Sequence, residues 1–434
     1  MPQILNSQPD AEPAPEPATA LAADKLLELE RAQRRRFSKR GDGEELKART
    51  GLKELDDYVL GGGVDRGVVL GISAGSGSGG SAGEDGTVEG RLISLHLLTS
   101  ILITSFSSRS PITKPVATII DTTGSFPIQL LVQILSSCLG KGREEDVSKL
   151  LELVTISRVF DLEGLWEVLS ELSQKPSSIP PSSEKQSEKQ IKSDSWEIGD
   201  SEDEDDDGDV GENFLKVKEE VVDEGVEVII IDNMTHIINE LFSRKEKSSA
   251  HSLLTILNTH LRMLTRTNNI LTILHNTTVS PSIKATSTTH QQEPQSVFST
   301  TTQKPSLGRI FAQFPDLHLL ISPQPRERSD IDILYCSDDE NDVDGQKIRK
   351  PVHYCFILEV LRDECPCLDQ DGKSRFADRE QRWLAFEREK GGGVGLVSIF
   401  RAKEDSMGIK MAQGGVVSDV GTIAKMHGFG GRRV

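Results

Sequence analysis

Short apolar runs and helix-periodic segments alternate along the first half of the chain. Val68–Ile72 is an apolar run, a loop dense in glycine follows it, and an apolar helical pattern starts near Arg91 and runs to about Ile103. Residues 115–121 (PVATIID) are typical of a buried parallel strand, and Phe126–Leu139 has the spacing of an amphipathic helix. A strand pattern at 151–157 and a helix pattern at 161–172 follow. This alternation favours a parallel sheet with helices on both faces.

The same alternation returns in the second half of the chain. Residues 226–232 (VEVIIID) form the most strand-like run, a short helix leads to a basic loop at 243–247, and 250–266 has a helical period. Residues 269–275 predict the next strand, and 317–322 and 353–361 predict late strands. In the lead-in, Leu52, Leu55 and Val59 share a helical face that ends at three glycines.

Polar and acidic segments interrupt these patterns and divide the chain. The net charge of −18 is concentrated in 194–224, with 15 acidic residues and two lysines, and in 330–344, with seven acidic residues and no base. Such composition does not bury a core and predicts disordered acidic insertions. The predicted organisation is a disordered tail and basic helix (1–45), an α/β core in three parts (46–172, 225–325 and 351–401), an insertion (173–224), an acidic loop (326–350) and a C-terminal tail (402–434).

Cysteine usage and the N-terminus indicate the compartment. The five cysteines are irregularly spaced and match no zinc motif, which favours reduced structural thiols in an intracellular protein. The N-terminus lacks the basic-then-apolar order of a signal peptide, and we expect a soluble protein. A basic cluster at 34–40 reads equally well as a solvated helix end, a nuclear localisation signal or a phosphate contact.

The glycine-dense loop has the strand–loop–helix order of a phosphate-binding loop, but the motif G-x-x-x-x-G-K-[ST] is absent. In one register, residues 74–81 fill the motif, with Gly80 in place of the lysine and Ser81 at the hydroxyl position. In the other, residues 83–92 fill it with one extra residue, and Arg91 and Leu92 replace lysine and hydroxyl. An empty glycine-rich surface loop is the competing interpretation. The candidate nucleotide-binding residues are Gly75, Gly79, Gly80, Ser81, Gly86, Thr87, Gly90, Arg91 and Asp232.

Seven short motifs in order resemble the core of the RecA family, in its eukaryotic Rad recombinase branch. They are the lead-in at 50–67, I-D-T-T-G-S-F at 120–126, I-I-I-D at 229–232, L-R-M-L at 261–264, the strand ending in H-N-T at 275–277, L-G-R-I-F at 307–311 and L-E-V-L-R-D at 358–363. The resemblance covers roughly 46–401 and implies a RecA-like P-loop NTPase core with ATP and Mg²⁺ as its cofactors.

The chain departs from that family where catalysis needs specific groups. The resemblance places the family's catalytic glutamate at Thr123 and its γ-phosphate-sensing glutamine at Thr277, while Asp232 keeps the carboxylate that anchors Mg²⁺ indirectly. Without the lysine and the glutamate, the site lacks several kcal/mol of transition-state stabilisation. We therefore expect weak nucleotide binding at most and little or no ATP hydrolysis. No catalytic residue and no direct metal ligand is predicted.

The family's DNA-facing loops correspond to 243–249 and 277–306 of this chain. Flexible basic loops suit contact with the phosphate backbone, which is independent of sequence and sensitive to salt. Phe298 is the only aromatic residue there that could stack on a base. The candidate DNA-binding residues are Arg244, Lys245, Lys247, Lys284 and Lys304.

Three functions remain open from the sequence. The first is a nuclear accessory paralogue of homologous recombination that binds single-stranded or junction DNA and recombinase subunits. The second is an ATPase-dead assembly subunit of a non-repair complex, as in the rings of Elongator. The third is an active DNA-dependent ATPase that uses Arg91.

Overall fold

The structure is a computed structural model, and it falls into two units, Met1–Leu46 and Lys47–Val434. The described residues are 23–25, 28, 47–75, 86–108, 114–173, 225–280, 296–298, 301, 303–335, 352–365, 379–389 and 393–399. In the first unit these are a few exposed helical residues. Most of the two predicted acidic segments, the basic cluster at 34–40 and the C-terminal tail lie outside the described residues.

A nine-stranded sheet organises the second unit, in the order β11-β10-β9-β8-β1-β5-β4-β2-β3. The strands are β1 (Val69–Ala74), β2 (Ala117–Asp121), β3 (Val154–Arg158), β4 (Val228–Asp232), β5 (Leu271–Asn276), β8 (Leu317–Pro325), β9 (Tyr354–Asp363), β10 (Trp383–Arg388) and β11 (Leu396–Ser398). Neighbouring strands from β8 through β3 pair in parallel, and β9, β10 and β11 extend the sheet antiparallel. A two-residue ribbon, β6 (Thr278–Val279) with β7 (Lys304–Pro305), stands apart from this sheet.

The strand order confirms the predicted fold class. β5 lies between β1, which leads into the glycine-dense loop, and β4, which ends in Asp232. The strands β8-β1-β5-β4-β2 are parallel, so their carboxyl ends share one edge of the sheet, where α/β folds bind ligands. The chain has a RecA-like α/β core with a mostly parallel central sheet flanked by helices.

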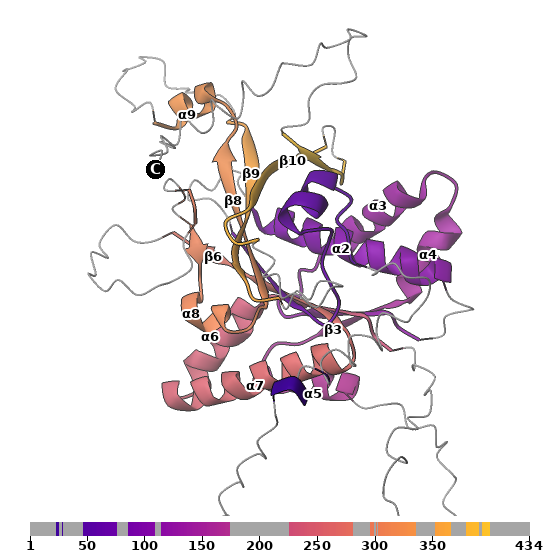
Figure 1. Cartoon of the computed structure of the whole chain (residues 1–434), viewed down its shortest axis with the longest axis vertical. Coiled ribbons are helices and arrows are strands. Elements are labelled where there is room, and N and C mark those ends of the chain that lie inside the picture. Colours follow the sequence, from indigo (N-terminus) through magenta and orange to yellow (C-terminus); the bar gives the residue numbers. More distant parts are fainter. Residues whose placement is uncertain are drawn as a thin grey trace, which may run out of the picture. The chain divides into compact units, whose positions relative to one another are not determined.

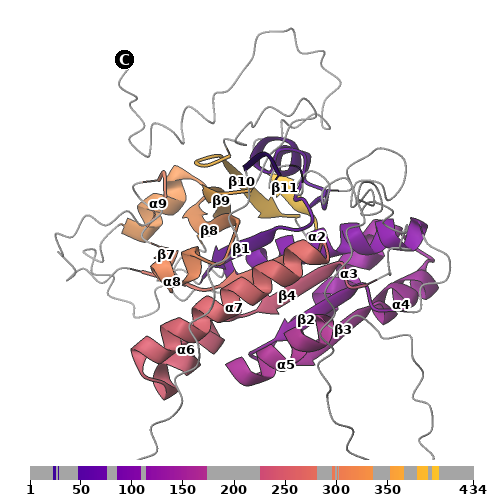
Figure 2. The same cartoon turned by 60° about the horizontal axis from the view of Figure 1, so that its bottom comes forward.

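Helices cover both faces of the sheet (Figures 1 and 2). On one face lie α2 (Gly86–Ser108), α3 (Ile128–Leu139) and α4 (Glu144–Glu152), which share a core with the strand residues Leu70, Ile72 and Ile119. On the other lie α5 (Leu162–Ser173), α6 (Met234–Arg244), α7 (Lys247–Thr267) and α8 (Gly308–Ala312). The last described helix, α9 (Arg328–Tyr335), follows β8.

Helix α2 is the one described helix whose length and composition would allow it to cross a membrane. Its residues Leu92, Ile93, Leu95, Leu97 and Leu98 are fully buried in the core that it shares with the sheet. The apolar character of α2 is therefore accounted for by packing.

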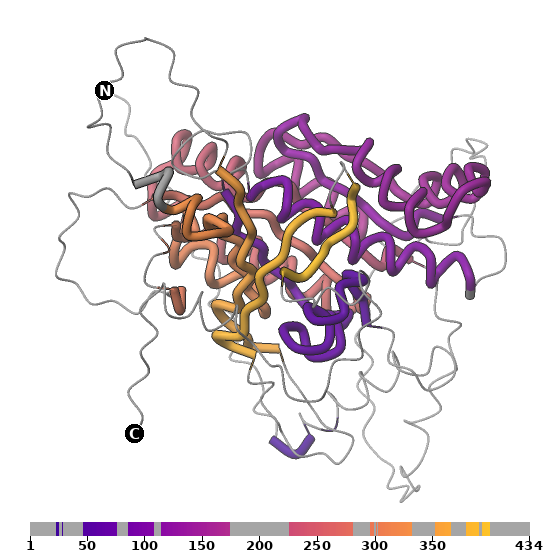
Figure 3. Tube along the Cα trace, turned by 90° about the horizontal axis from the view of Figure 1, so that it is seen from above, coloured from indigo at the N-terminus to yellow at the C-terminus, as the bar shows by residue number. Residues whose placement is uncertain are grey.

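The lead-in folds against the antiparallel end of the sheet, beside the C-terminal strands (Figure 3). It contains a short π-helix, η1 (Leu55–Val59), which buries Leu55 and Val59 as their shared face predicted. The buried Arg379 guanidinium donates to the Leu60 carbonyl at 2.9 Å and pairs with Asp363. These contacts join residues 319 positions apart in sequence and hold the lead-in to β1 against the C-terminal part of the chain.

Several sequence predictions of local structure need correction. Helix α2 begins at Gly86, five residues before the predicted start, and α4, β10 and β11 were not predicted. The predicted basic loop at 243–247 is a short break, because α6 ends at Arg244 and α7 begins at Lys247. His236, for which a buried or half-buried place was expected, is exposed, and Trp166, with the same expectation, is half-buried.

Candidate functional site: the carboxyl edge of the parallel strands

The glycine-dense loop leaves β1 at Gly75 and re-enters α2 at Gly86, and these two residues lie together. The Gly86 N–H donates to the Gly75 carbonyl at 3.2 Å. A Cβ on Gly75 would approach the Thr278 hydroxyl to 2.1 Å, so this position requires glycine. Residues 76–85, which include the candidates Gly79, Gly80 and Ser81, lie outside the described residues.

The start of α2 bears on both predicted registers of the phosphate loop. A phosphate loop places its lysine where the following helix begins, because the first helical N–H groups face the phosphate. Here that place belongs to Gly86 and Thr87, whereas Gly80 precedes it and Arg91 lies in the second turn of α2. Leu92, read as the replacement for the metal-binding hydroxyl, is fully buried in the core. Gly90 lets α2 approach β1, since its Cβ would lie 3.1 Å from that of Ala74.

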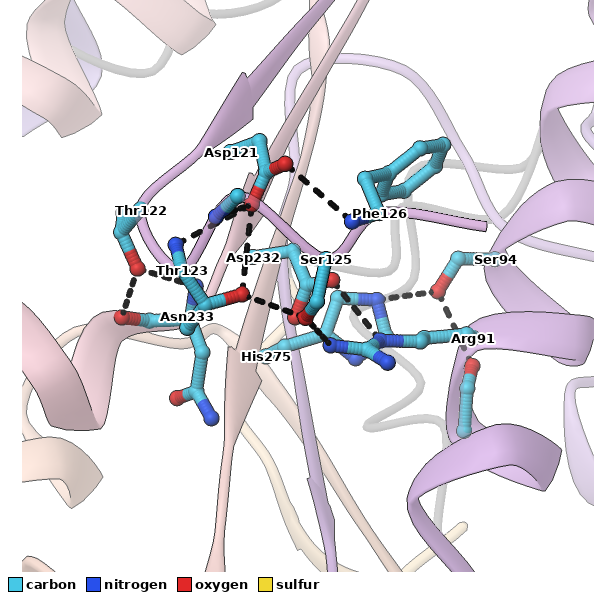
Figure 4. A network of polar contacts seen from close by, with 12 residues as sticks. Arg91, Ser94, Asp121, Thr122, Thr123, Ser125, Phe126, Asp232, Asn233 and His275 are labelled. Atoms are coloured by element: carbon cyan, nitrogen blue, oxygen red, sulfur yellow. Dashed lines mark hydrogen bonds and ion pairs between the residues drawn. The ribbon is translucent and has the colours of Figure 1, made fainter. Parts of the chain in front are cut away.

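Arg91 reaches from α2 to the end of β4 and pairs with Asp232 (Figure 4). Its Nε donates to Asp232 Oδ2 at 2.8 Å, and its Nη2 donates to Ser125 Oγ at 3.4 Å. The Arg91 side chain is 19% exposed and that of Asp232 is 2% exposed. One guanidinium therefore joins α2, β4 and the turn after β2. The sequence identified both residues but gave no indication that they pair.

The turn after β2 is organised by Asp121, which stands opposite Asp232 in the β2–β4 register. Asp121 accepts backbone N–H groups from Gly124 at 2.8 Å and from Thr123 and Phe126 at 3.1 Å. Burial raises the pKa of Asp121, but these donors outweigh it and hold the pKa below the usual range of an aspartate. Asp121 is thus a structural strand-end residue.

Thr123, at the position of the family's catalytic glutamate, contributes only a hydroxyl. This hydroxyl lies 3.3 Å from Asp121 Oδ1 and 2.7 Å from Ser125 Oγ, so it belongs to the turn itself. A threonine hydroxyl is not basic enough to take a proton from water, and no carboxylate stands in its place.

His275 fills the space between α2 and the end of β5. Its Nε2 lies 2.7 Å from Ser94 Oγ, and the ring is almost fully buried. Burial lowers the pKa of His275, and the Arg91 charge lowers it further against the opposing effect of Asp232. His275 is therefore neutral at physiological pH and acts as a packed structural group.

Arg91, Asp232 and His275 help to line a cavity of about 80 Å³ at the strand ends. Its lining residues are Ala74, Thr87, Arg91, Asp232, Asn233, His275 and Asn276. Small-molecule sites generally enclose roughly 300–1,000 Å³. The Asp232 carboxylate already has a cation as its partner, and Thr87 is the one hydroxyl of α2 in the lining. The described residues therefore do not fit Mg²⁺–ATP.

Thr277, at the position of the γ-phosphate sensor, is absent from the cavity lining and joins a hydroxyl network. Its hydroxyl donates to Ser306 Oγ at 3.0 Å, and its N–H donates to Thr235 Oγ1 at 2.9 Å. Asn276 is the centre of this network: its Oδ1 accepts from Thr235 and Ser306, and its Nδ2 donates to Ser73 Oγ. This network, which the sequence did not reveal, ties the two ends of the 277–306 loop to the sheet.

The candidate DNA-binding residues lie in two places. Arg244, Lys245 and Lys247 are exposed at the break between α6 and α7, where Arg244 pairs with Glu240 and lies 4.0 Å from Asp161. Lys304 is exposed on β7, and Lys284 lies outside the described residues. Phe298 is buried and packs edge-on against Trp383 with ring centroids 5.0 Å apart, so it offers no stacking surface.

Cysteines and metal ligands add no further site among the described residues. Cys355 and Cys365 are buried free thiols, Cys138 is an exposed one, and burial raises the pKa of all three. Cys336 and Cys367 lie outside the described residues. No group of three His, Cys, Asp or Glu side chains within the described part of the chain could hold a metal ion.

Comparison with known proteins adds little to this geometry. No family model matches the chain, and no curated protein matches it. Among solved structures, the crystal structure of the RadB recombinase is similar, with 15% sequence identity over 79% of this chain and 96% of that chain and a TM-score of 0.40. This degree of likeness carries no argument about activity, and the fold assignment stands on the strand order.

Proposed function

We propose that this chain is an accessory recombinase paralogue of DNA recombination and repair, which binds DNA and a related recombinase subunit and hydrolyses ATP weakly or not at all. The observation that carries the loss of turnover is the Arg91–Asp232 ion pair, which occupies the carboxylate that would anchor Mg²⁺. Thr123 supports it, because a threonine hydroxyl is not basic enough to activate water. Without ATP turnover, the role that we propose for this intact α/β core is to bind DNA and a partner subunit.

Two observations support DNA as a ligand. Lys245 and Lys247 are exposed side by side in the break between α6 and α7. The hydroxyl network on Asn276 fixes both stems of the 277–306 loop, which contains Lys284 and Lys304. The contact would be with the phosphate backbone and would weaken with salt. The basic cluster at 34–40 supports the nucleus as the compartment.

The first test measures DNA binding and ATP turnover with the purified full-length chain. We expect labelled single-stranded DNA to bind with an affinity that falls steeply with salt, and ATPase activity at background. Replacing Lys245 and Lys247 by glutamate should weaken binding to every sequence alike, and the log–log salt slope should fall by about 0.7 for each phosphate that the protein no longer neutralises. Lys149→Glu, on the opposite face of the sheet, is the matched control.

Two results would overturn the proposal. ATP turnover at an ordinary rate that Asp232→Ala abolishes would show that the site is active. Failure to bind any DNA, together with co-purification with a tRNA-modification complex, would assign the chain to an ATPase-dead assembly subunit. Affinity purification of the tagged chain followed by mass spectrometry identifies the partner in either case.

A further inference from the structure

The Arg91–Asp232 pair places a positive charge beside a buried carboxylate. A buried carboxylate is costly unless a cation and hydrogen bonds accompany it. Asp232 is 2% exposed, and its cation is supplied from within the chain, 141 residues away in sequence. The charge of the site is thus balanced without any metal or nucleotide.

Arg91 is also placed to hold three segments together. Its Nε contacts the end of β4, its Nη2 contacts Ser125 in the turn after β2, and its backbone belongs to α2 (Figure 4). Thr122 continues the connection, because its hydroxyl donates to the Asn233 carbonyl at 3.0 Å and accepts the Asn233 N–H at 2.8 Å. Thr123, Gly124 and Ser125 are exposed, so these contacts hold one side of a solvent-facing turn that Asp121 shapes.

We propose that Arg91 is a built-in cationic clamp, which does permanently what a bound metal–phosphate group would do transiently: it neutralises Asp232 and fixes the turn at 122–126 against α2 and β4. Arg91 acts through Asp232 and Ser125 and is a positioning residue. The turn is thereby held in one conformation whether or not nucleotide is present. This inference deepens the proposed function at the same site, and its readouts need neither DNA nor a partner protein.

Hydrogen–deuterium exchange of Arg91→Ala tests the clamp. Amides of 122–126 should exchange on the order of tenfold faster than in the unchanged protein, because a local opening that was coupled to a buried ion pair becomes easier. Low-millimolar guanidinium chloride, far below denaturing concentrations, or Mg²⁺ should restore slow exchange, since either cation can replace the lost charge. Exchange at 122–126 of the unchanged protein should not respond to Mg²⁺–ATP.

Two further variants keep the test decisive if Arg91→Ala folds poorly. Arg91→Lys keeps the charge and should retain most of the protection, whereas Arg91→Gln should lose it. Arg66→Ala is the matched control, because Arg66 is a comparably buried arginine. Its guanidinium lies 2.6 Å from the Glu227 carboxylate, and this pair is away from the turn. It should leave exchange at 122–126 unchanged relative to the rest of the sheet.

Three outcomes would overturn the clamp. One is unchanged exchange at 122–126 in both Arg91→Ala and Arg91→Gln. Another is faster exchange that neither cation restores, which would reduce Arg91 to a packing residue. A third is exchange at 122–126 of the unchanged protein that Mg²⁺–ATP slows. Loss of DNA binding alone overturns the proposed function and leaves the clamp standing.

Discussion

Two aspartates end neighbouring strands in the same register, and the chain neutralises them in different ways. Asp121 at the end of β2 stands opposite Asp232 at the end of β4. Asp121 receives three backbone N–H groups from the five residues that follow it. Asp232 receives a guanidinium from a helix 141 residues earlier. The first arrangement is local and shapes a turn, and the second is long-range and joins a helix to a strand end.

The difference shows which of the two aspartates has the capacity to bind a metal ion. A carboxylate saturated by its own turn has little capacity left for a metal, whereas one neutralised by a side chain becomes available when that side chain moves or is removed. The proposed loss of turnover therefore depends more on Arg91 than on Asp232. The following predictions test this contrast, from the largest expected effect to the smallest.

Removing the guanidinium should cost more stability than any other single change at these strand ends. Arg91→Ala leaves Asp232 buried without a counter-charge, and we expect a loss of about 3 kcal/mol in the free energy of unfolding. Urea denaturation followed by circular dichroism measures it. Combining Arg91→Ala with Asp232→Asn should recover much of the loss, and additive effects of the two changes would contradict the pairing.

Removing the Asp121 carboxylate should lower the free energy of unfolding by less than Arg91→Ala does. Asp121→Ala leaves three N–H groups in a partly exposed turn, where water satisfies some of them, and we expect a loss of about 2 kcal/mol. The same urea titration measures it. A loss larger than that of Arg91→Ala would reverse the contrast between the two aspartates.

The Asp121 contribution should also depend on pH, with a sign that follows from its lowered pKa. Because the folded pKa lies below the unfolded value of 3.8, the stabilisation is complete above that value and is lost as the pH falls through the folded pKa. The stability difference between the unchanged protein and Asp121→Asn should therefore shrink below about pH 4. A difference that stays constant between pH 5 and pH 2 would exclude the carboxylate as its source.

His275 reports on the charge balance of Asp232. Arg91 lowers the pKa of His275 and Asp232 raises it, so Arg91→Ala should move this pKa upward and Asp232→Asn should move it downward. Imidazole chemical shifts measured by NMR across a pH titration give both directions.

The smallest effect should come from restoring the missing base alone. Thr123→Glu places a carboxylate at the position of the family's catalytic glutamate. We nevertheless expect ATPase activity to stay at background, because Arg91 remains paired with Asp232. A phosphate-release assay measures this. A clear gain of turnover in Thr123→Glu would mean that the ion pair does not block the site.

The chain's residue pattern by itself determined the core and the local features of the site. Apolar runs of the right length gave β1, β2, β4 and β5, because a strand buried on both faces must be apolar throughout. The Asp121 turn was identifiable from D-T-T-G, since an aspartate that accepts the N–H groups of the next few residues needs only local sequence. The resemblance to the RecA family placed the missing lysine at Gly80 or Arg91 and the missing glutamate at Thr123.

Only the tertiary structure decided which side chains meet at the site. The start of α2 at Gly86 depends on the closure of the glycine loop on Gly75 and on the close packing of Gly90 against β1, which no periodicity encodes. The Arg91–Asp232 pair and the Asn276 network join residues that are far apart in sequence and meet only where parallel strands end together. Backbone hydrogen bonding to a neighbouring carboxylate is a local property, whereas the counter-charge of a buried carboxylate is decided by the whole fold.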